Sequence, residues 1–401
     1  MSYKNILMVV EANFNTNHIG VRRVISYHFK NLVARGHNVI LATHRDGHWV
    51  GCSLLDATRA ILEDVHVSDT QPPYWKTGDG YLAEPAHIAP QHQSQISIQW
   101  DGPKVRPEDF DESILTNPWL CAVNGEPITD GAFSVGIVYD MVPNLIALGC
   151  LRMPQFLDIY RFAEEHHIGY EYFLRNAKTI SCISESTRRD FLALYGSAVD
   201  QQVDVCIPFG DFGGGSPKRD PSATDVLMIN VLDQRKNFST AAKALKEASM
   251  KTRLHVVIVG RERLPWNDVM KFLVEISAVC ASVRWYRSPS DIQIQELMTH
   301  AKVVFFPSFY EGLGLPILES QARGVPVVSS NNSSCGEINL SDGLTADPYD
   351  YHAQADLLVG VLSGTLAVPS GQILRDRQLA FLSGKNQFFV LDNPVLEAAN
   401  A

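Results

Sequence analysis

The chain has 401 residues, of which 45% are hydrophobic and 19% are charged, and its formal net charge is −10 at pH 7. This length exceeds one comfortable hydrophobic core and predicts two domains. The acidic balance, with no cluster of lysine and arginine, excludes a nucleic-acid binder, because phosphate backbones are held mainly by clustered basic side chains.

The seven cysteines contain no Cys-x-x-Cys pair, and we expect buried thiols in a reducing compartment. No run reaches about 18 apolar residues, and the N-terminal apolar run is too short for a secretory signal. We therefore expect a soluble, cytoplasmic protein. Peripheral association with the inner face of the membrane stays open, and so does a homo-oligomer.

The first half of the chain alternates strands and helices, which is typical of a doubly wound parallel sheet. We assign residues 1–208 to an N-terminal Rossmann-like domain. Its expected elements are strand Asn5–Val10, helix Val21–Arg35, strand Asn38–Ala42, strand Val135–Tyr139, helix Arg161–Asn176, strand Thr179–Ile183, helix Ser186–Tyr195 and strand Val203–Ile207.

The alternation fades over residues 52–118, which are rich in Pro, Gly, Gln and His with interspersed aromatic residues. Such a stretch is either plain surface loop or a segment that shapes an acceptor site. It contains Asp109-Phe110-Asp111, which superficially matches an Asp-x-Asp metal site but follows no expected strand. His166 and His167 are interpreted as part of a surface run, because adjacent helical residues point in different directions. We predict no metal site.

A stretch dense in glycine and proline, residues 209–222, predicts the linker between domains. A second Rossmann-like domain is expected over residues 223–380, and residues 381–401 are expected to cross back onto the first domain. The elements of the second domain are Val226–Val231, Thr240–Ala248, Leu254–Val259, Val269–Ala281, Asp291–His300, Val303–Phe306, Leu315–Arg323 and Val325–Ser329.

The segment Phe305–Gly324 sets Glu311 and Glu319 on either side of a turn between a buried strand and a helix. Free backbone N–H groups at a helix N-terminus attract anions, and Gly312 and Gly314 lack the Cβ that would keep a ligand away. The carboxylates suit hydroxyl groups on either side of a diphosphate. By spacing alone, a solvated Glu311 and a Glu319 that complements the helix dipole are equally acceptable.

This segment resembles the signature of the large retaining glycosyltransferase family, in which two glutamates eight positions apart define the donor site. Asn230–Asn237 is similar to the family's Gly-x-x-x-x-Arg-Lys-Asn segment, and Tyr139–Pro143 is similar to its His-Asp-x-x-Pro segment. Ser184–Arg188 also matches. The resemblance extends from about residue 134 to about residue 350. Asn230 stands where the family has glycine, and Tyr139 stands where it has histidine.

The resemblance implies an α/β protein of the GT-B fold, with two Rossmann-like doubly wound domains facing a cleft. It implies transfer of a hexose from a nucleotide diphosphate sugar to a hydroxyl of a glycan or lipid-linked oligosaccharide, in cell-surface polysaccharide or lipopolysaccharide synthesis. Asp-x-x-Pro together with Arg-Lys-Asn resembles the mannosyltransferase-like branch, so GDP-mannose is the first expected donor. UDP- and dTDP-sugars are the alternatives.

The resemblance also implies the site residues. Glu311 would orient the sugar ring, and Lys236 and Arg235 would stabilise the leaving diphosphate. The donor and acceptor would further contact Glu319, Gly312, Leu313, Gly314, Leu315, Tyr139, Asp140 and Gly20. No metal and no cofactor are expected, and no second carboxylate is placed as a nucleophile.

A rival from another class is a non-catalytic sugar-nucleotide-binding scaffold subunit. Tyr139 and the loop Glu11–Gly20, which contains one glycine where the family commonly carries a pair, favour it. A competing enzyme is a glycan phosphorylase or sucrose-type synthase on the same fold.

Overall fold

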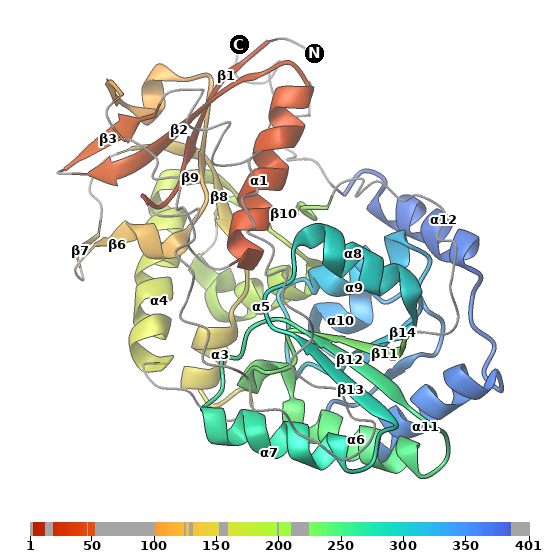
Figure 1. The fold of residues 1–401 in the computed structure, drawn as a ribbon. Helices are drawn as coiled ribbons and strands as arrows, with labels where there is room; N and C mark the ends of the chain where they lie inside the picture. Colours follow the sequence, from red (N-terminus) through yellow and green to blue (C-terminus); the bar gives the residue numbers. More distant parts are fainter. Residues whose placement is uncertain are drawn as a thin grey trace. The chain divides into compact units, whose positions relative to one another are not determined.

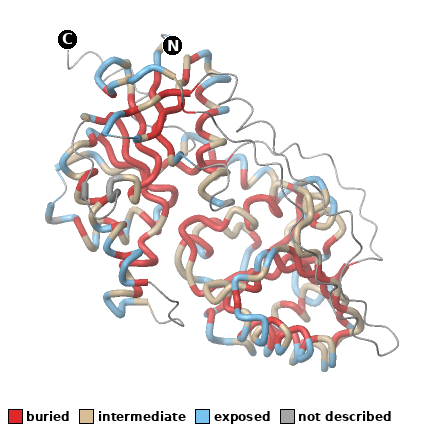
Figure 2. Tube along the Cα trace, turned by 60° about the vertical axis from the view of Figure 1, so that its left-hand side comes forward, coloured by how far each residue is buried: buried red, intermediate tan, exposed pale blue. Residues whose placement is uncertain are grey.

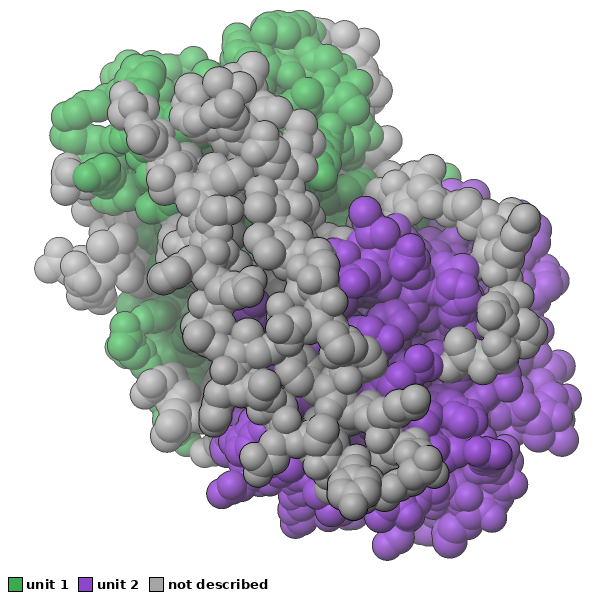
Figure 3. Space-filling view, in the orientation of Figure 1, with its two compact units in different colours: residues 1–65, 94–210, 382–401 green, residues 66–93, 211–381 purple. Residues whose placement is uncertain are grey.

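The structure is a computed structural model that describes residues 3–12, 19–45, 47–52, 100, 102–123, 126–127, 131–151, 159–198, 200–209 and 224–385. It divides into two compact units (Figure 3). Unit 1 comprises residues 1–65, 94–210 and 382–401, and unit 2 comprises residues 66–93 and 211–381.

Unit 1 is built on a mostly parallel sheet, whose strands lie in the order β10-β9-β8-β5-β1-β2-β3-β4 in the described part of the chain (Figure 1). The strands are β1 (Asn5–Val9), β2 (Asn38–Arg45), β3 (His48–Gly51), β4 (Lys104–Val105), β5 (Glu112–Leu115), β8 (Phe133–Val138), β9 (Ala177–Cys182) and β10 (Gln202–Val205). β1 pairs in parallel with β2 on one side and with β5 on the other. The order of strands therefore reverses between β1 and β5, which makes this the topological switch point of the sheet.

The helices of unit 1 are α1 (Ile19–Ala34), α3 (Val142–Ala147), α4 (Ile159–Asn176) and α5 (Glu185–Tyr195), with the short elements η1 (Pro107–Asp109), η2 (Pro118–Cys121), β6 (Ala122–Val123), β7 (Glu126–Pro127) and η3 (Gly196–Ala198). α4 lies very close to η2. A Cβ on Gly169 would be only 2.1 Å from the Pro118 carbonyl oxygen, so this approach requires glycine. α4 thereby fixes the segment that follows β5.

Unit 2 contains a parallel sheet with the strand order β13-β12-β11-β14-β15-β16 in its described part. Its strands are β11 (Thr224–Ile229), β12 (His255–Val259), β13 (Ser282–Tyr286), β14 (Ala301–Phe306), β15 (Val327–Ser330) and β16 (Thr345–Ala346). Numbered along the chain, this is the order 3-2-1-4-5-6 of a Rossmann sheet, with its switch point between β11 and β14.

Helices cover both faces of this sheet, as continuous apolar strands require. Figure 1 shows α6 (Phe238–Ser249), α7 (Trp266–Ser277) and α11 (Tyr351–Ser363) on one face, and α8 (Asp291–His300) and α9 (Leu315–Ala322) on the other. The remaining helices are η4 (Gln234–Lys236), α10 (Ser333–Ile338) and α12 (Gly371–Leu382).

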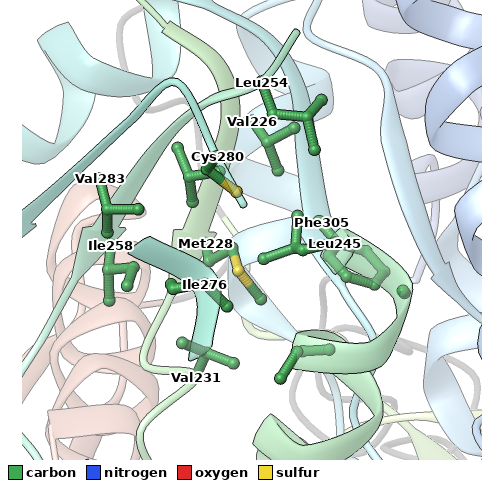
Figure 4. Close-up of a cluster of buried hydrophobic side chains, with 14 of the residues drawn as sticks. Val226, Met228, Val231, Leu245, Leu254, Ile258, Ile276, Cys280, Val283 and Phe305 are labelled. Carbon is green, nitrogen blue, oxygen red and sulfur yellow. The ribbon is translucent and has the colours of Figure 1, made fainter. Parts of the chain in front are cut away.

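The core of unit 2 lies between the first face and the strands. Val226 and Met228 of β11 contact Leu245 of α6 and Ile276 of α7 in one buried cluster (Figure 4). Most strand residues of both sheets are buried, and Figure 2 shows that buried segments run through both units.

Several described strands were not predicted, and β5 and β13 change the two sheets most. β5, at the centre of the sheet of unit 1, lies inside the stretch for which no regular element was predicted, residues 52–118. Four residues are too few for a period of two to be legible. β13 was also missed, because Arg284 and Tyr286 interrupt its apolar pattern at the edge of the sheet.

The C-terminal part of the described chain returns to unit 1. After α12, the Lys385 carbonyl oxygen accepts a hydrogen bond of 2.6 Å from the Ile207 N–H, just beyond β10. Residues 386–401, which make up most of the predicted crossover tail, lie outside the described residues, as do residues 210–223 of the predicted linker. Among the described helices, none has the length and apolar character needed to span a membrane.

Candidate active site

The residue that follows β11, Asn230, has a left-handed backbone conformation. Asn230 has φ of 55°, a conformation that glycine adopts freely and that asparagine tolerates better than most other residues. This explains how an asparagine can occupy a position at which glycine is the usual residue. Its side chain fills the space beside Gly260, where a Cβ would be 2.1 Å from the Asn230 Oδ1.

A buried asparagine then ties three loops together. Asn237, which precedes α6, is fully buried and also left-handed, with φ of 61°. Its Nδ2 donates to the Pro307 carbonyl oxygen at 3.0 Å and to the Pro348 carbonyl oxygen at 2.6 Å. The Phe309 N–H donates to the Arg235 carbonyl oxygen at 2.9 Å. The loops after β11, β14 and β16 are therefore held as one body.

Lys236 and Glu311 meet at the switch point of unit 2. The Lys236 Nζ is 2.6 Å from the Glu311 Oε1, and both side chains are almost completely buried. The same Nζ lies 4.7 Å from the centroid of the Phe306 ring. The Glu311 N–H donates to the Ser333 Oγ, and the Ser334 Oγ donates to the Glu311 carbonyl oxygen. The backbone of Glu311 is thus held by α10, and its carboxylate is held by Lys236.

The charge state of Glu311 follows from its neighbours. Burial by itself would raise the pKa of this carboxyl, but the charges of Lys236 and Arg235 outweigh burial and lower the pKa below its usual value. Glu311 is ionised at neutral pH and is only 5% exposed. The alternative interpretation, a solvated loop residue, is therefore wrong.

The glycine-bearing turn between the two glutamates begins α9. Gly314 has φ of 86° and precedes Leu315, and Pro316 occupies the first turn, where its missing N–H costs nothing. Gly312 and Leu313, which lead into the turn, are both buried. Glu319, on the second turn of α9, is 4% exposed, and its carbonyl oxygen accepts a hydrogen bond from Arg323. The four predicted site residues of unit 2 therefore lie on segments that follow the carboxyl ends of β11 and β14. They are Arg235, Lys236, Glu311 and Glu319.

The predicted residues of unit 1 lie at the end of β8. Tyr139 is buried, which raises its pKa well above the usual value, and the charge of Glu11 raises that pKa further. Asp140 accepts a hydrogen bond from the Val142 N–H at 3.0 Å, as a turn-forming aspartate does. Gly20 lies in α1, and a Cβ there would meet no atom within 4 Å, so the structure gives no steric reason for glycine.

Several polar and aromatic residues of unit 1 that surround Trp119 or follow the same strands were not predicted. Glu11 follows β1, Asn117 and Trp119 follow β5, and His166 comes from α4. His166 is 4% exposed and contacts the Trp119 ring, so its assignment to a surface run is wrong. These residues were missed because β5 was not predicted. Asn117-Pro-Trp can be placed at the end of a strand only when β5 is known.

Asp109 and Asp111 do not converge. Asp109 pairs with Arg106 at 2.7 Å, whereas Asp111 accepts a hydrogen bond from the Asn5 N–H at 2.7 Å. Within the described residues, no group of three or more His, Cys, Asp or Glu side chains is arranged to hold a metal ion.

A buried lysine–carboxylate pair at a Rossmann switch point, beside a helix N-terminus, suits a ligand that carries both phosphate and hydroxyl groups. Residues 216–367 match the family model described as "Glycosyl transferases group 1". The segment that matches this glycosyltransferase family contains Arg235, Lys236, Glu311 and Glu319.

A curated relative matches over a similar region. The chain is 31% identical to "O-antigen chain mannosyltransferase B" of Escherichia coli over 191 residues, which make up 45% of this chain and 50% of that protein. The chain is 27% identical over 161 residues to "Probable sucrose-phosphate synthase 1" of Oryza sativa subsp. indica, of which it spans 15%. The chain therefore spans half or less of these relatives.

Solved structures match over nearly the whole chain. The sucrose-phosphate synthase of Thermosynechococcus elongatus has a TM-score of 0.61 at 14% identity and covers 99% of both chains. Anabaena Alr3699/HepE, solved with UDP-glucose, has a TM-score of 0.59 at 13% identity and covers 99% of this chain and all of that one. These neighbours show the GT-B fold, with two Rossmann-like domains, that the sequence predicted.

Proposed function

We propose that this protein is a retaining glycosyltransferase. Its first proposed reaction is transfer of mannose from GDP-mannose to a hydroxyl of a glycan or lipid-linked oligosaccharide, in cell-surface polysaccharide synthesis. The match to the glycosyltransferase family and the relative named for O-antigen mannosyl transfer support this choice. UDP- or dTDP-sugars are the alternative donors, and the neighbour solved with UDP-glucose supports UDP.

The single observation that carries the proposal is the ion pair of Lys236 and Glu311 at the switch point of unit 2. Negative charge develops on the diphosphate as its bond to the anomeric carbon breaks. Lys236, Arg235 and the backbone N–H groups from Gly312 to Leu315 would stabilise that charge. Glu311 would accept a hydrogen bond from a sugar hydroxyl, and Glu319 would accept hydrogen bonds from the ribose.

The proposed step is a same-face displacement. The bond between the anomeric carbon and the leaving phosphate oxygen breaks while the acceptor oxygen forms its bond from the same side. The acceptor proton passes to the leaving phosphate, so retention requires no protein nucleophile. The proposal uses no metal and no cofactor, because Lys236 and Arg235 supply the positive charge. Its partners are the nucleotide sugar and the acceptor.

A calorimetric titration tests the donor site. The full chain is titrated with GDP, UDP, dTDP and their common sugar conjugates, with and without divalent metal. We expect one nucleotide to bind without metal, and we expect binding to fall below detection in Lys236→Ala and Glu319→Ala. Lys251→Ala is the matched control, because Lys251 forms an exposed ion pair with Asp356. Silence across the panel would overturn the donor assignment.

The scaffold alternative needs a separate test. Loss of transfer in Glu311→Ala, with nucleotide binding retained, supports the enzyme. A cellular role that survives Glu311→Ala would favour the sugar-nucleotide-binding subunit instead.

A further inference from the structure

The loop that carries Glu311 is held by side chains that follow the neighbouring strand. β15 pairs in parallel with β14, so the two strands end at the same edge of the sheet. The Glu311 N–H donates to the Ser333 Oγ at 3.1 Å, and the Ser334 Oγ donates to the Glu311 carbonyl oxygen at 2.9 Å. Both hydrogen-bonding groups of the Glu311 backbone are therefore bound by the first two residues of α10.

Two further hydrogen bonds fix the residues that precede Glu311. The Ser330 Oγ donates to the Ser308 carbonyl oxygen at 2.7 Å, and the Asn332 Nδ2 donates to the Phe309 carbonyl oxygen at 2.7 Å. Ser330 and Ser308 are both 0% exposed. The segment between β15 and α10 therefore binds the loop before Glu311 as well as Glu311 itself.

Ser333 has an uncommon backbone conformation. Its φ is 49°, in the left-handed region that serine rarely adopts. Such strain persists only where the surrounding structure imposes it, and it is concentrated at functional sites. The start of α10 is also closely packed, since a Cβ on Gly336 would be 2.4 Å from the Asn331 carbonyl oxygen. The serines that bind Glu311 therefore lie on a strained and closely packed turn.

The other end of α10 is bound to α9, the helix that carries Glu319. The Gln321 Nε2 donates to the Ile338 carbonyl oxygen at 2.9 Å, and the Gln321 Oε1 accepts a hydrogen bond from the Leu340 N–H at 2.5 Å. Gln321 is 0% exposed and lies two residues after Glu319. A Cβ on Gly314 would be 3.4 Å from the Ile338 Cδ1, so α10 also packs near the glycine-bearing turn.

The distance between the two glutamates matters because they would bind one ligand at two places. In the proposed function, Glu311 binds a sugar hydroxyl and Glu319 binds the ribose, with the diphosphate between them. A small misplacement of a group that positions a substrate lowers the rate strongly. We propose that α10 is a template that sets this distance. Ser334 is the positioning residue for Glu311, and Gln321 is the positioning residue for Glu319; the roles of the two glutamates rest on the proposed function.

Binding measurements separate the two ends of the template. GDP and GDP-mannose are titrated calorimetrically into the full chain, and UDP and UDP-glucose, or dTDP and dTDP-glucose, replace them if GDP does not bind. In Ser334→Ala we expect the Kd of the sugar nucleotide to rise about tenfold while that of the nucleoside diphosphate stays unchanged, because only the sugar contacts Glu311. In Gln321→Met we expect both Kd values to rise about tenfold, because both ligands carry the pentose.

Ser341→Ala is the matched control for Ser334→Ala. Ser341 is 1% exposed and also binds the backbone, as the acceptor for the Val327 N–H at 3.1 Å. Val327 is the first residue of β15, whereas Glu311 follows the carboxyl end of the neighbouring strand. Ser341→Ala should lower Tm about as much as Ser334→Ala and leave both Kd values unchanged.

The Ser334→Ala result decides the proposal even if Gln321→Met does not fold. A Ser334→Ala protein that loses stability as Ser341→Ala does, but keeps the wild-type Kd for both ligands, would show that Ser334 serves the fold alone and would overturn the template. Folded Gln321→Met with unchanged Kd values would overturn it as well. A wild-type protein that binds none of the nucleotides overturns the proposed function instead.

Discussion

At the scale of single residues, Lys236 and Glu311 depend on each other. Removing one partner of a buried ion pair leaves an uncompensated charge, which costs about 3–5 kcal/mol. We therefore expect Lys236→Ala to lower the free energy of unfolding by about that amount in urea titrations without ligand. Lys251→Ala, at an exposed pair, should change it by less than about 1 kcal/mol.

The double variant Lys236→Met/Glu311→Gln sharpens this test. It removes both charges, so it should regain much of the stability that Lys236→Ala loses, while nucleotide binding stays absent. If Lys236→Ala is as stable as the wild type, Glu311 is not the buried anion described above.

Glu11 predicts a pH dependence. Burial, and next the charge of Glu165, raise the pKa of Glu11 to about 7. The carboxyl is therefore neutral below about pH 7 and ionised above it, and an ionised acceptor makes the stronger hydrogen bond. We expect the indole N–H of Trp119, which donates to the Glu11 Oε1, to change its NMR chemical shift between pH 6 and pH 8 as this carboxyl ionises.

The pH dependence is assigned to Glu11 because the neighbouring titratable groups change charge at other pH values. Burial lowers the pKa of His166 and raises that of Tyr139, so both pKa values shift away from this range. Asp140 and Glu165 are the remaining charged groups near His166. Glu11→Gln keeps the shape of the side chain and should give a flat profile. A profile that keeps its slope in Glu11→Gln would assign the titration to another group.

At the scale of elements, Asn237 positions the loops that follow three strands. Asn237→Ala removes the two amide hydrogen bonds and also places alanine in a left-handed backbone conformation, which alanine tolerates less well than asparagine. Asn237→Gly removes only the hydrogen bonds, because glycine adopts this conformation freely. We expect a roughly tenfold weaker Kd for nucleotide in both variants and a lower Tm in Asn237→Ala than in Asn237→Gly. Calorimetry and thermal unfolding measure these.

Asn176→Ala is the control for this change. Its Nδ2 donates to the Tyr172 carbonyl oxygen on α4, so it also loses an amide hydrogen bond but in unit 1. Nucleotide binding that is unaffected in both Asn237 variants would show that the loops hold their positions without this amide.

Elements with a strong local sequence pattern could be predicted from the sequence, whereas elements placed by their neighbours could not. Long apolar strands such as β14 and the glycine-bearing turn before α9 have local patterns that the sequence shows directly. That Glu311 and Lys236 share one site was predicted from the family resemblance. β5 is four residues long and takes its place from the strands on both sides, which is tertiary information. Without β5, the sequence could not bring Asn117 and Trp119 to the ends of β1 and β8.

At the scale of the whole molecule, each unit carries a polar group at its own switch point, and the two groups have opposite electrostatic character. Nucleotide binding at Lys236 and Arg235 is an interaction between charges, which salt screens. We expect the nucleotide Kd to rise several-fold when NaCl is raised from about 50 mM to about 500 mM. A nucleotide Kd that does not change with salt would contradict binding at these two cations.

Unit 1 is discontinuous along the chain, because residues 382–401 join it after all of residues 211–381 have been used for unit 2. The hydrogen bond from the Ile207 N–H to the Lys385 carbonyl oxygen is one contact that closes it. During synthesis from the N-terminus, a ribosome therefore releases the whole of residues 211–381 before this contact can form. The buried core of unit 2 lies within the segment 211–381, so all of its residues have been synthesised before this contact of unit 1 forms.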